Sequence, residues 1–317
     1  MYKLENLEPS FLESPRIPYV STRAKGIYAN ILLDYWFKRT FAELPFSERL
    51  LILLLRELIP ERKIASLSYV HQEHTNPYPD ARGVRVDVEV TDENGSRFLV
   101  EMQREPQDWF YERAIYYASH CILQQMPQGQ DDFSFPPVYF IGIMDFALHN
   151  DPQRVMYRYA LREDQDKDLM TDSLHFIFLE LPNCGRALTP QATVLDNFCF
   201  ALHNMQFLEE RPDALRQEIF DLLFDAAEIA TFTPEDKVKY EFEMTTERDI
   251  RNQIAFAKKN ARAEGKAEGR AEGKSEGLLE RSIETARKML AKGYPMEEIT
   301  EISELPVEQV RALQEEV

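Results

Sequence analysis

Apolar and polar residues alternate on both sides of a turn between positions 83 and 103, and this pattern predicts a β-hairpin. The first strand carries valine at every second position, at Val86, Val88 and Val90. The second strand repeats the alternation with Phe98, Val100 and Met102. The turn contains Gly95, which adopts positive φ without strain, and a three-residue loop places Asp87 directly opposite Glu101. The hairpin then has one apolar face and one polar face that gathers Asp87, Glu89, Glu101 and Gln103.

Further apolar patterns predict more strands and several helices around this hairpin. The continuous apolar run at 138–146 is typical of a strand buried on both faces, and 64–70, 155–161 and 174–181 also suit strands. Helical spacing occurs at 28–41, 47–58, 109–126 and through most of 190–250. Ser47 is the expected N-cap of the second helix, and Thr233-Pro234 is the expected start of the last one. Strands interleaved with helices predict an α/β fold.

The composition changes at 263–277, where AEGKAEGRAEGKSEG repeats every four residues. Each glycine at every fourth position destabilises an isolated helix by about 1 kcal/mol relative to alanine. Like charges recur at i, i+4, and their repulsion destabilises an isolated helix further. Two interpretations stay open, a flexible linker or an oligomerising stalk in which the charged stripes of two copies pair. The second is favoured, because small residues permit close approach between helices.

The last forty residues predict three short helices. An amphipathic helix at 278–292 has Ile283, Ala286, Met289 and Leu290 on one face and ends at Gly293, and two helices at 295–302 and 306–313 follow. Such short turns are typical of helix-turn-helix modules, but Arg311 is the sole basic residue on the expected recognition helix. A protein-contact bundle fits this tail at least as well as a DNA reader. We therefore predict a globular domain at 20–250, a stalk or linker at 251–280 and a helical tail at 281–317.

Charge restricts how this chain could bind nucleic acid. The sequence has 37 lysines and arginines against 55 aspartates and glutamates, which gives a formal charge of −18. A broad basic surface that grips DNA phosphates is therefore not expected, and DNA binding would depend on a local basic patch or on metal-bridged phosphates.

Cysteines and hydropathy bear on the compartment. Cys121, Cys184 and Cys199 are widely spaced and odd in number, which suits a reducing compartment better than a disulfide framework. The first residues lack the basic and apolar regions of a signal peptide, and the most apolar run, 50–55, is too short to cross a bilayer. These features predict a soluble, cytoplasmic protein without a membrane partner.

The polar face of the hairpin has two interpretations. Opposed carboxylates repel unless a cation lies between them, and Mg²⁺ takes one or two carboxylates together with water and phosphate oxygens. Asp87 and Glu101 meet that requirement. Gln103, two positions after Glu101, could orient an attacking water. Acidic faces that simply contact solvent are nevertheless common, and the pattern alone favours that second interpretation.

Two helical segments carry polar residues with the same ambiguity. Asp34 and Lys38 are spaced i, i+4, as in an ordinary surface ion pair. Arg113, Tyr116 and Tyr117 share one neighbourhood of a helix, and this spacing favours a packing stripe over phosphate contacts.

Other polar residues are expected to be structural. His71 and His74 lie in a proline-rich loop, 71–82, without the partner spacing of a metal site. Asp145 and Glu180 lie at or near strand ends, where caps and turns are expected.

Several motifs together resemble the recombination-promoting nuclease and putative transposase family, a branch of the PD-(D/E)XK nuclease superfamily. They are DYWFKRTF at 34–41, VDVEV at 86–90, FLVEMQ at 98–103, ERAIYY at 112–117, VYFIGIMDF at 138–146 and FIFLELP at 176–182, followed by the EG-repeat and IETARKMLAKGYPMEEIT at the end. The resemblance runs in order over nearly the whole chain. It implies a PD-(D/E)XK nuclease-like α/β fold with a mixed four-stranded sheet flanked by helices, an active site at its central hairpin, and an all-helical C-terminal tail.

The same resemblance implies roles for particular residues. Asp87 and Glu101 match the two acids that bind the metal, Mg²⁺ or Mn²⁺, and Gln103 stands where the superfamily usually has lysine. As a catalytic residue, Gln103 can orient the attacking water by hydrogen bonding, but its amide brings no positive charge to the transition state. Either the metal and a nearby cation such as Lys38 or Arg113 cover that charge, or cleavage is slow. Asp34 is a candidate addition to the site, and Arg113 and Tyr117 are candidate supports or phosphate contacts.

The function that the resemblance implies is a metal-dependent DNA endonuclease linked to recombination or mobile elements. The repeat at 263–277, by its own pattern, adds the expectation of a homo-oligomer. The alternative is a catalytically weak or inactive nuclease-fold scaffold that binds DNA or protein through its helical tail.

Overall fold

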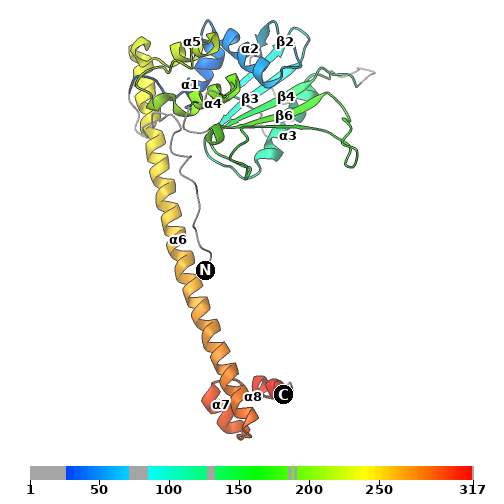
Figure 1. The fold of residues 1–317 in the computed structure, drawn as a ribbon, viewed down its shortest axis with the longest axis vertical. Coiled ribbons are helices and arrows are strands. Elements are labelled where there is room, and N and C mark those ends of the chain that lie inside the picture. The colour runs from blue at the N-terminus through cyan, green and yellow to red at the C-terminus, as the bar shows by residue number, and fades with distance from the viewer. Residues whose placement is uncertain (1–25, 71–84, 127–132, 185–187, 189–190, 316–317) are drawn as a thin grey trace, which may run out of the picture. The chain divides into compact units, whose positions relative to one another are not determined.

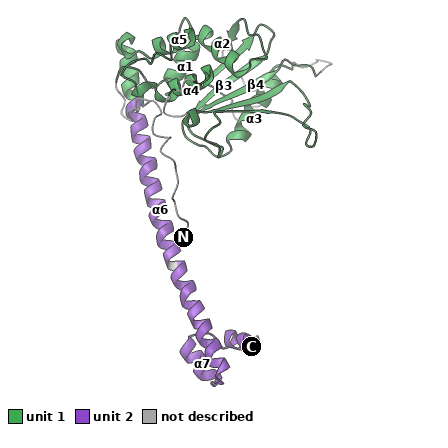
Figure 2. Ribbon diagram, in the orientation of Figure 1, with its two compact units in different colours: residues 1–243 green, residues 244–317 purple. Residues whose placement is uncertain are grey.

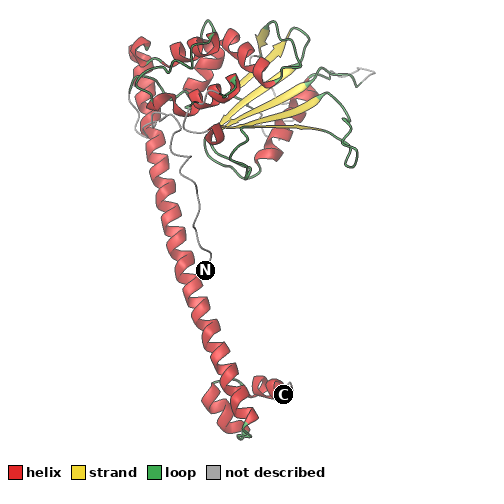
Figure 3. Ribbon diagram, in the orientation of Figure 1, coloured by secondary structure: helices red, strands yellow, loops and turns green. Residues whose placement is uncertain are grey.

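One mixed sheet of six strands organises the first of two compact units in the computed structural model (Figures 1 and 3). The strands are β1 (Leu67–Tyr69), β2 (Val88–Asp92), β3 (Arg97–Gln103), β4 (Val138–Met144), β5 (Met156–Ala160) and β6 (Leu174–Glu180). Their order is β1-β2-β3-β4-β6-β5, with β3, β4 and β6 mutually parallel and the other pairs antiparallel. This arrangement confirms the predicted α/β fold with a mixed sheet flanked by helices.

The structure describes residues 26–70, 85–126, 133–184, 188 and 191–315. The expected irregular lead-in at 1–20, the loop 71–82 with its two histidines, and Gly83 lie outside these residues. The two units are Met1–Glu243 and Met244–Val317 (Figure 2). The predicted three-part division of the chain stays a prediction.

Helices cover both faces of the sheet, which explains why all seven residues of β4 are buried. On one face lie α1 (Asp34–Lys38), a π-helix (Arg39–Glu43), α2 (Ser47–Leu58), α4 (Val194–Asn204) and α5 (Glu218–Ala227), and on the other lies α3 (Phe110–Gln124) (Figure 1). Short 3₁₀ turns occupy Leu181–Cys184, Met205–Phe207 and Ile229–Thr231. The hairpin is thus enclosed between two hydrophobic layers.

The β2–β3 hairpin has the register expected from its loop. Val88 pairs with Val100 and Thr91 with Arg97, so the next pair beyond the ladder is Asp87 with Glu101. Asp92 closes the turn, because its Oδ1 accepts hydrogen bonds from the backbone N–H groups of Asn94 and Ser96 at 3.0 and 2.7 Å. Gly95 has φ of +83°, as predicted.

The faces of the hairpin differ from the prediction in two respects. Val86 packs in the α3 layer and not with Val88 and Val90, because the chain bends at Asp87 before β2 begins. The polar face is not solvated either. Glu89 and Glu101 are each only 6% exposed beneath α3, which contradicts the interpretation of an exposed acidic face.

A glycine in β4 lets α3 approach the sheet closely. Gly142 pairs with Glu101 in the parallel ladder. A Cβ at this position would lie 2.8 Å from Phe178 and 3.2 Å from Phe110, the first residue of α3. The hydrogen side chain therefore makes room for the ring of Phe110 on the sheet.

Two helix starts were predicted, and one of them was wrong. Helix α6 (Pro234–Ala291) begins as expected, with the Thr233 hydroxyl accepting a hydrogen bond from the Asp236 N–H at 3.1 Å. Ser47 does not cap α2. Its hydroxyl accepts from the Leu44 N–H at 2.9 Å and donates to the Thr40 carbonyl at 2.7 Å, so it contacts the preceding π-helix and its C-cap instead of the first turn of α2.

The second unit consists of the rest of α6, α7 (Met296–Ser303) and α8 (Val307–Glu315). The predicted apolar face of 278–292 is correct, since Ala286 and Met289 join Ile299, Val310 and Leu313 in a small core of their own. Gly293 ends α6 with φ of +75°, and the Tyr294 N–H donates to the Met289 carbonyl at 3.2 Å, as in a Schellman motif.

The four-residue repeat at 263–277, called the stalk repeat below, is helical as part of α6. A Cβ on Gly265, Gly269, Gly273 or Gly277 would meet no atom within 4 Å in the described part of the chain. Among the described residues, none of the helices is both long and apolar enough to span a membrane.

Candidate active site

Asp87 and Glu101, the acid pair, face each other at the open end of the hairpin. The Asp87 N–H donates to Glu101 Oε2 at 3.2 Å, and the Met102 N–H donates to Asp87 Oδ2 at 2.9 Å. Each carboxylate is therefore held by the backbone of the opposite strand. The structure brings together the two residues that the sequence placed opposite each other.

Burial makes this pair costly to ionise. Glu101 is 6% exposed, and the Asp87 side chain is 13% exposed. Burial, with the nearby charge of Asp87, raises the pKa of Glu101 to about 7. Burial also raises the pKa of Asp87, although the Met102 N–H and Lys38 oppose the shift. A proton or a cation shared by the two carboxylates would relieve this repulsion.

Gln103 contacts one member of the pair. Its Nε2 donates to Glu101 Oε1 at 2.9 Å, from two residues further along the same face of β3. The amide therefore orients the Glu101 carboxylate without contributing charge.

Two cations flank the acid pair, as the absence of a lysine at position 103 led us to expect. Lys38 Nζ lies 3.3 Å from Asp87 Oδ1, and Arg113 Nη2 lies 3.7 Å from Glu101 Oε1. Lys38 also forms the predicted i, i+4 pair with Asp34, at 2.6 Å. Asp34 is 68% exposed, and in this structure it reaches the acid pair through Lys38.

Arg113 has donors that the described residues leave unsatisfied. Its Nη1 donates to Gln107 Oε1, but its buried Nε and Nη2 have no hydrogen-bond acceptor among the described residues. An anionic oxygen is the partner that a buried guanidinium binds best. The predicted packing stripe is also present in part, since the Tyr117 ring lies 6.4 Å from that of Phe140 and beneath the Arg113 guanidinium.

The acid pair is chemically suited to a hard divalent cation. Two carboxylates, with water and a phosphate completing the shell, are the ligands that Mg²⁺ usually takes in proteins. Across the described ranges there is no group of three or more histidine, cysteine or acidic side chains placed to bind a metal.

Sequence reasoning missed Glu243, which lies close to Asp34 and Lys38. Its Oε1 accepts from the Tyr35 N–H at 3.2 Å, whereas its buried Oε2 has no hydrogen-bond partner in the described structure. Burial raises the pKa of Glu243, and the charge of Asp34 adds to the shift. Glu243 comes from α6, distant in sequence from the hairpin, so its spacing gives no signal.

Other acids are structural or paired. Glu180 accepts from the N–H groups of Leu148 and His149 at 2.9 and 3.0 Å, which confirms its expected turn role. Asp145 instead contacts His203 Nδ1 at 2.6 Å.

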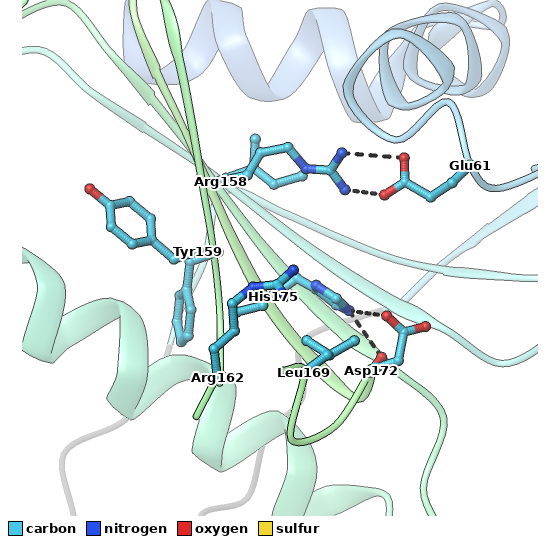
Figure 4. A pocket seen from close by; sticks show the side chains of 10 residues that line it. Glu61, Arg158, Tyr159, Arg162, Leu169, Asp172 and His175 are labelled. Atoms are coloured by element: carbon cyan, nitrogen blue, oxygen red, sulfur yellow. Dashed lines mark hydrogen bonds and ion pairs between the residues drawn. The ribbon is translucent and has the colours of Figure 1, made fainter. Parts of the chain in front are cut away.

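A separate cleft of about 330 Å³ lies between β5, β6 and the loops near them (Figure 4). Its charged groups already have partners, since Arg158 pairs with Glu61 and His175 with Asp172. His175 lies near the start of β6. Glu180 lies at the end of β6 and is level with Gln103, because both pair with Met144 of β4. The cleft is thus at the opposite end of the strands from the acid pair.

The raised pKa of Glu101 predicts how stability depends on pH. Because the folded pKa of about 7 exceeds the value of 4.5 for a free glutamate, folding favours the protonated form. The resulting stabilisation is complete below pH 4.5 and is lost as pH rises through 7. In EDTA, we expect the unfolding free energy to fall between pH 5 and pH 8 by about 1–3 kcal/mol more than in Glu101→Gln. Urea unfolding of both proteins at the two pH values measures this difference, and equal pH dependence would contradict the prediction.

Comparison with known proteins adds a family to this geometry. A family model described as PD-(D/E)XK nuclease family transposase matches residues 31–257. The matched range contains the acid pair, Gln103, both flanking cations and Glu243. No curated protein and no solved structure matches the chain significantly.

Proposed function

The chain belongs to the PD-(D/E)XK nuclease family transposases, and from this premise we propose that it is a metal-dependent DNA endonuclease acting in recombination or in mobile-element biology. The observation that carries the proposal is the acid pair, two buried carboxylates held face to face by each other's strands. Asp87 and Glu101 would hold Mg²⁺ or Mn²⁺. When bound, the metal polarises the scissile phosphate and activates the attacking water.

The chain's own side chains have separable tasks in this proposal. Arg113 binds a phosphate oxygen through Nε and Nη2, which have no hydrogen-bond acceptor among the described residues, although Nη2 lies 3.7 Å from Glu101 Oε1. Lys38 places a second positive charge beside Asp87, where negative charge develops during hydrolysis. Gln103 holds the Glu101 carboxylate in position, and Asp34 and Tyr117 support Lys38 and Arg113, respectively.

A second candidate is a nuclease-fold scaffold that binds without cutting. The observation that favours it is that protein groups already contact both carboxylates, with Lys38 on Asp87 and Gln103 on Glu101. If these contacts outcompete a metal, the fold would keep its DNA-binding or protein-binding surface and lose catalysis.

The test is nicking of supercoiled plasmid by the purified full-length protein. We expect relaxed and linear products with Mg²⁺ or Mn²⁺, and none with EDTA. Direct titration of Mn²⁺ provides a readout besides activity. Failure to cleave with either metal, together with no Mn²⁺ binding, would favour the scaffold.

Assembly and compartment complete the proposal. We propose that the stalk repeat joins copies of the chain as a homo-oligomer, supported by its helical form and by glycines that contact nothing in the described chain. We propose action in the cytoplasm, where Cys121, Cys184 and Cys199, which form no disulfide in the described structure, would stay reduced.

A further inference from the structure

Trp109 is an unusual residue at the start of α3, the helix that carries Arg113. It is 75% exposed, although tryptophan usually buries its large apolar surface. It also has left-handed backbone angles, with φ of 62° and ψ of 31°, at the start of α3. Bulky side chains rarely adopt this conformation, and strain of this kind concentrates at sites that bind ligands.

A cleft of about 520 Å³ opens next to this indole. It is lined by residues 107–109, Glu112, Arg113, Tyr116 and Tyr117. Its walls are thus rich in aromatic rings, with one guanidinium among them. Small-molecule sites in proteins commonly have this size and this mixture of rings with a few polar groups.

The cleft shares residues with the proposed catalytic site. Arg113 lines the cleft and lies 3.7 Å from Glu101. Tyr117 also lines the cleft. Burial raises the pKa of the Tyr117 hydroxyl, and the nearby charge of Glu101 raises it further. A group bound in the cleft would therefore be adjacent to a phosphate held by Arg113.

Charge decides what kind of group fits. Asp108 and Glu112 line the cleft and would repel a phosphate, and the whole chain carries a formal charge of −18. Aromatic faces, by contrast, bind any nucleobase by stacking and need no positive surface. The cleft is therefore suited to a base, while the single guanidinium serves the backbone next to it.

We propose that Trp109 and its cleft bind an unpaired nucleobase, so that the acid pair acts on single-stranded DNA or on a single-stranded stretch within a duplex. The inference rests on the proposed function for the position of the scissile phosphate. A base within an intact duplex is covered by its neighbours, so it must be unstacked to reach the indole.

Tryptophan fluorescence tests this directly, because the chain has only two tryptophans. Trp36 is 0% exposed and stacks on Phe232 at 4.2 Å, so quenching by added DNA reports Trp109. The titrations use the full-length protein in EDTA, which prevents cleavage. The probes are oligothymidylate, the same strand annealed to oligoadenylate, and an abasic strand of equal length.

We expect oligothymidylate to quench the emission and to bind more tightly than either the duplex or the abasic strand. Trp109→Gly should weaken oligothymidylate binding by about 5- to 150-fold, the range for loss of one stacked base. Glycine accepts positive φ, so this variant should fold, which urea unfolding will check. Trp109→Tyr should restore most of the affinity.

Several results would overturn the inference. One is equal binding of single strand and duplex, and another is unchanged affinity in Trp109→Gly. A third is a lower mass of Trp109→Gly in light scattering with DNA affinity intact, since the exposed ring would then join copies of the protein. Single-strand binding through Trp109 stands even if no metal supports cleavage. Duplex cleavage insensitive to Trp109→Gly would refute this inference and leave the nuclease proposal intact.

Discussion

Replacing Asp87 by asparagine is expected to lower the rate of plasmid cleavage about 10³-fold or more, equivalent to about 4 kcal/mol of transition-state stabilisation. Asparagine keeps the volume of the side chain, and its amide oxygen can still accept the Met102 N–H. What it removes is the negative charge that holds a divalent cation. Glu101→Gln should have an effect of the same order, because the two carboxylates act as one site.

Glu89→Gln is the matched control for these variants. Glu89 is also a buried acid of the same hairpin, but its Oε1 pairs with Arg97 Nη1 at 2.7 Å and not with the acid pair. We expect its cleavage rate to stay close to that of the original protein. Initial nicking rates over a range of Mg²⁺ concentrations, with Mn²⁺ titration alongside, compare the three variants. Cleavage that survives both acid-pair substitutions would exclude this site as the catalytic centre.

The triple substitution Gly265→Ala, Gly269→Ala and Gly273→Ala is expected to lower the oligomeric mass in light scattering. Within one chain the added methyl groups meet open space, and each alanine stabilises an isolated helix by about 1 kcal/mol. Between closely packed helices, however, three methyl groups would force the axes apart. The variant should therefore stabilise the helix within one chain and weaken the proposed association between chains.

A second variant separates these two effects. Asn252→Ala with Asn260→Ala raises helix propensity at exposed positions of α6 outside the stalk repeat, and it should leave the mass unchanged. Deleting 262–277 should lower the mass as the triple substitution does. If the triple substitution raises helicity in circular dichroism while the mass of every variant equals that of the original, the repeat does not join copies.

Local patterns predicted the hairpin because its register depends on neighbouring residues. The three-residue loop and Gly95 were sufficient to place Asp87 opposite Glu101. The burial of the acidic face could not be predicted from the same pattern, because α3, which covers it, comes from a later segment. Val86 was assigned to the wrong face of the hairpin, because the alternating pattern assumes a straight strand. The bend at Asp87 interrupts that strand.

Long-range contacts account for most of what the sequence did not reveal. The salt bridge from Lys38 to Asp87 joins a helix to the hairpin, and only the functional need for positive charge suggested it. Glu243 comes from the opposite end of the first unit, so its position near Lys38 has no counterpart in spacing. Ser47 was misassigned because its hydroxyl bonds to the Thr40 carbonyl in the π-helix before it, a rare element that helical spacing does not reveal.

Gly142 shows that mutational sensitivity in this protein need not follow chemical function. It has no side chain that could take part in catalysis, yet the space left by that side chain determines how closely α3 packs on the sheet. Arg113, Tyr117 and Trp109 all depend on that height, because they belong to the first turns of α3 or precede it directly. A random screen for inactive variants should therefore recover substitutions at this position alongside those of the acids, since a larger residue would shift every contact that α3 makes with the hairpin at once.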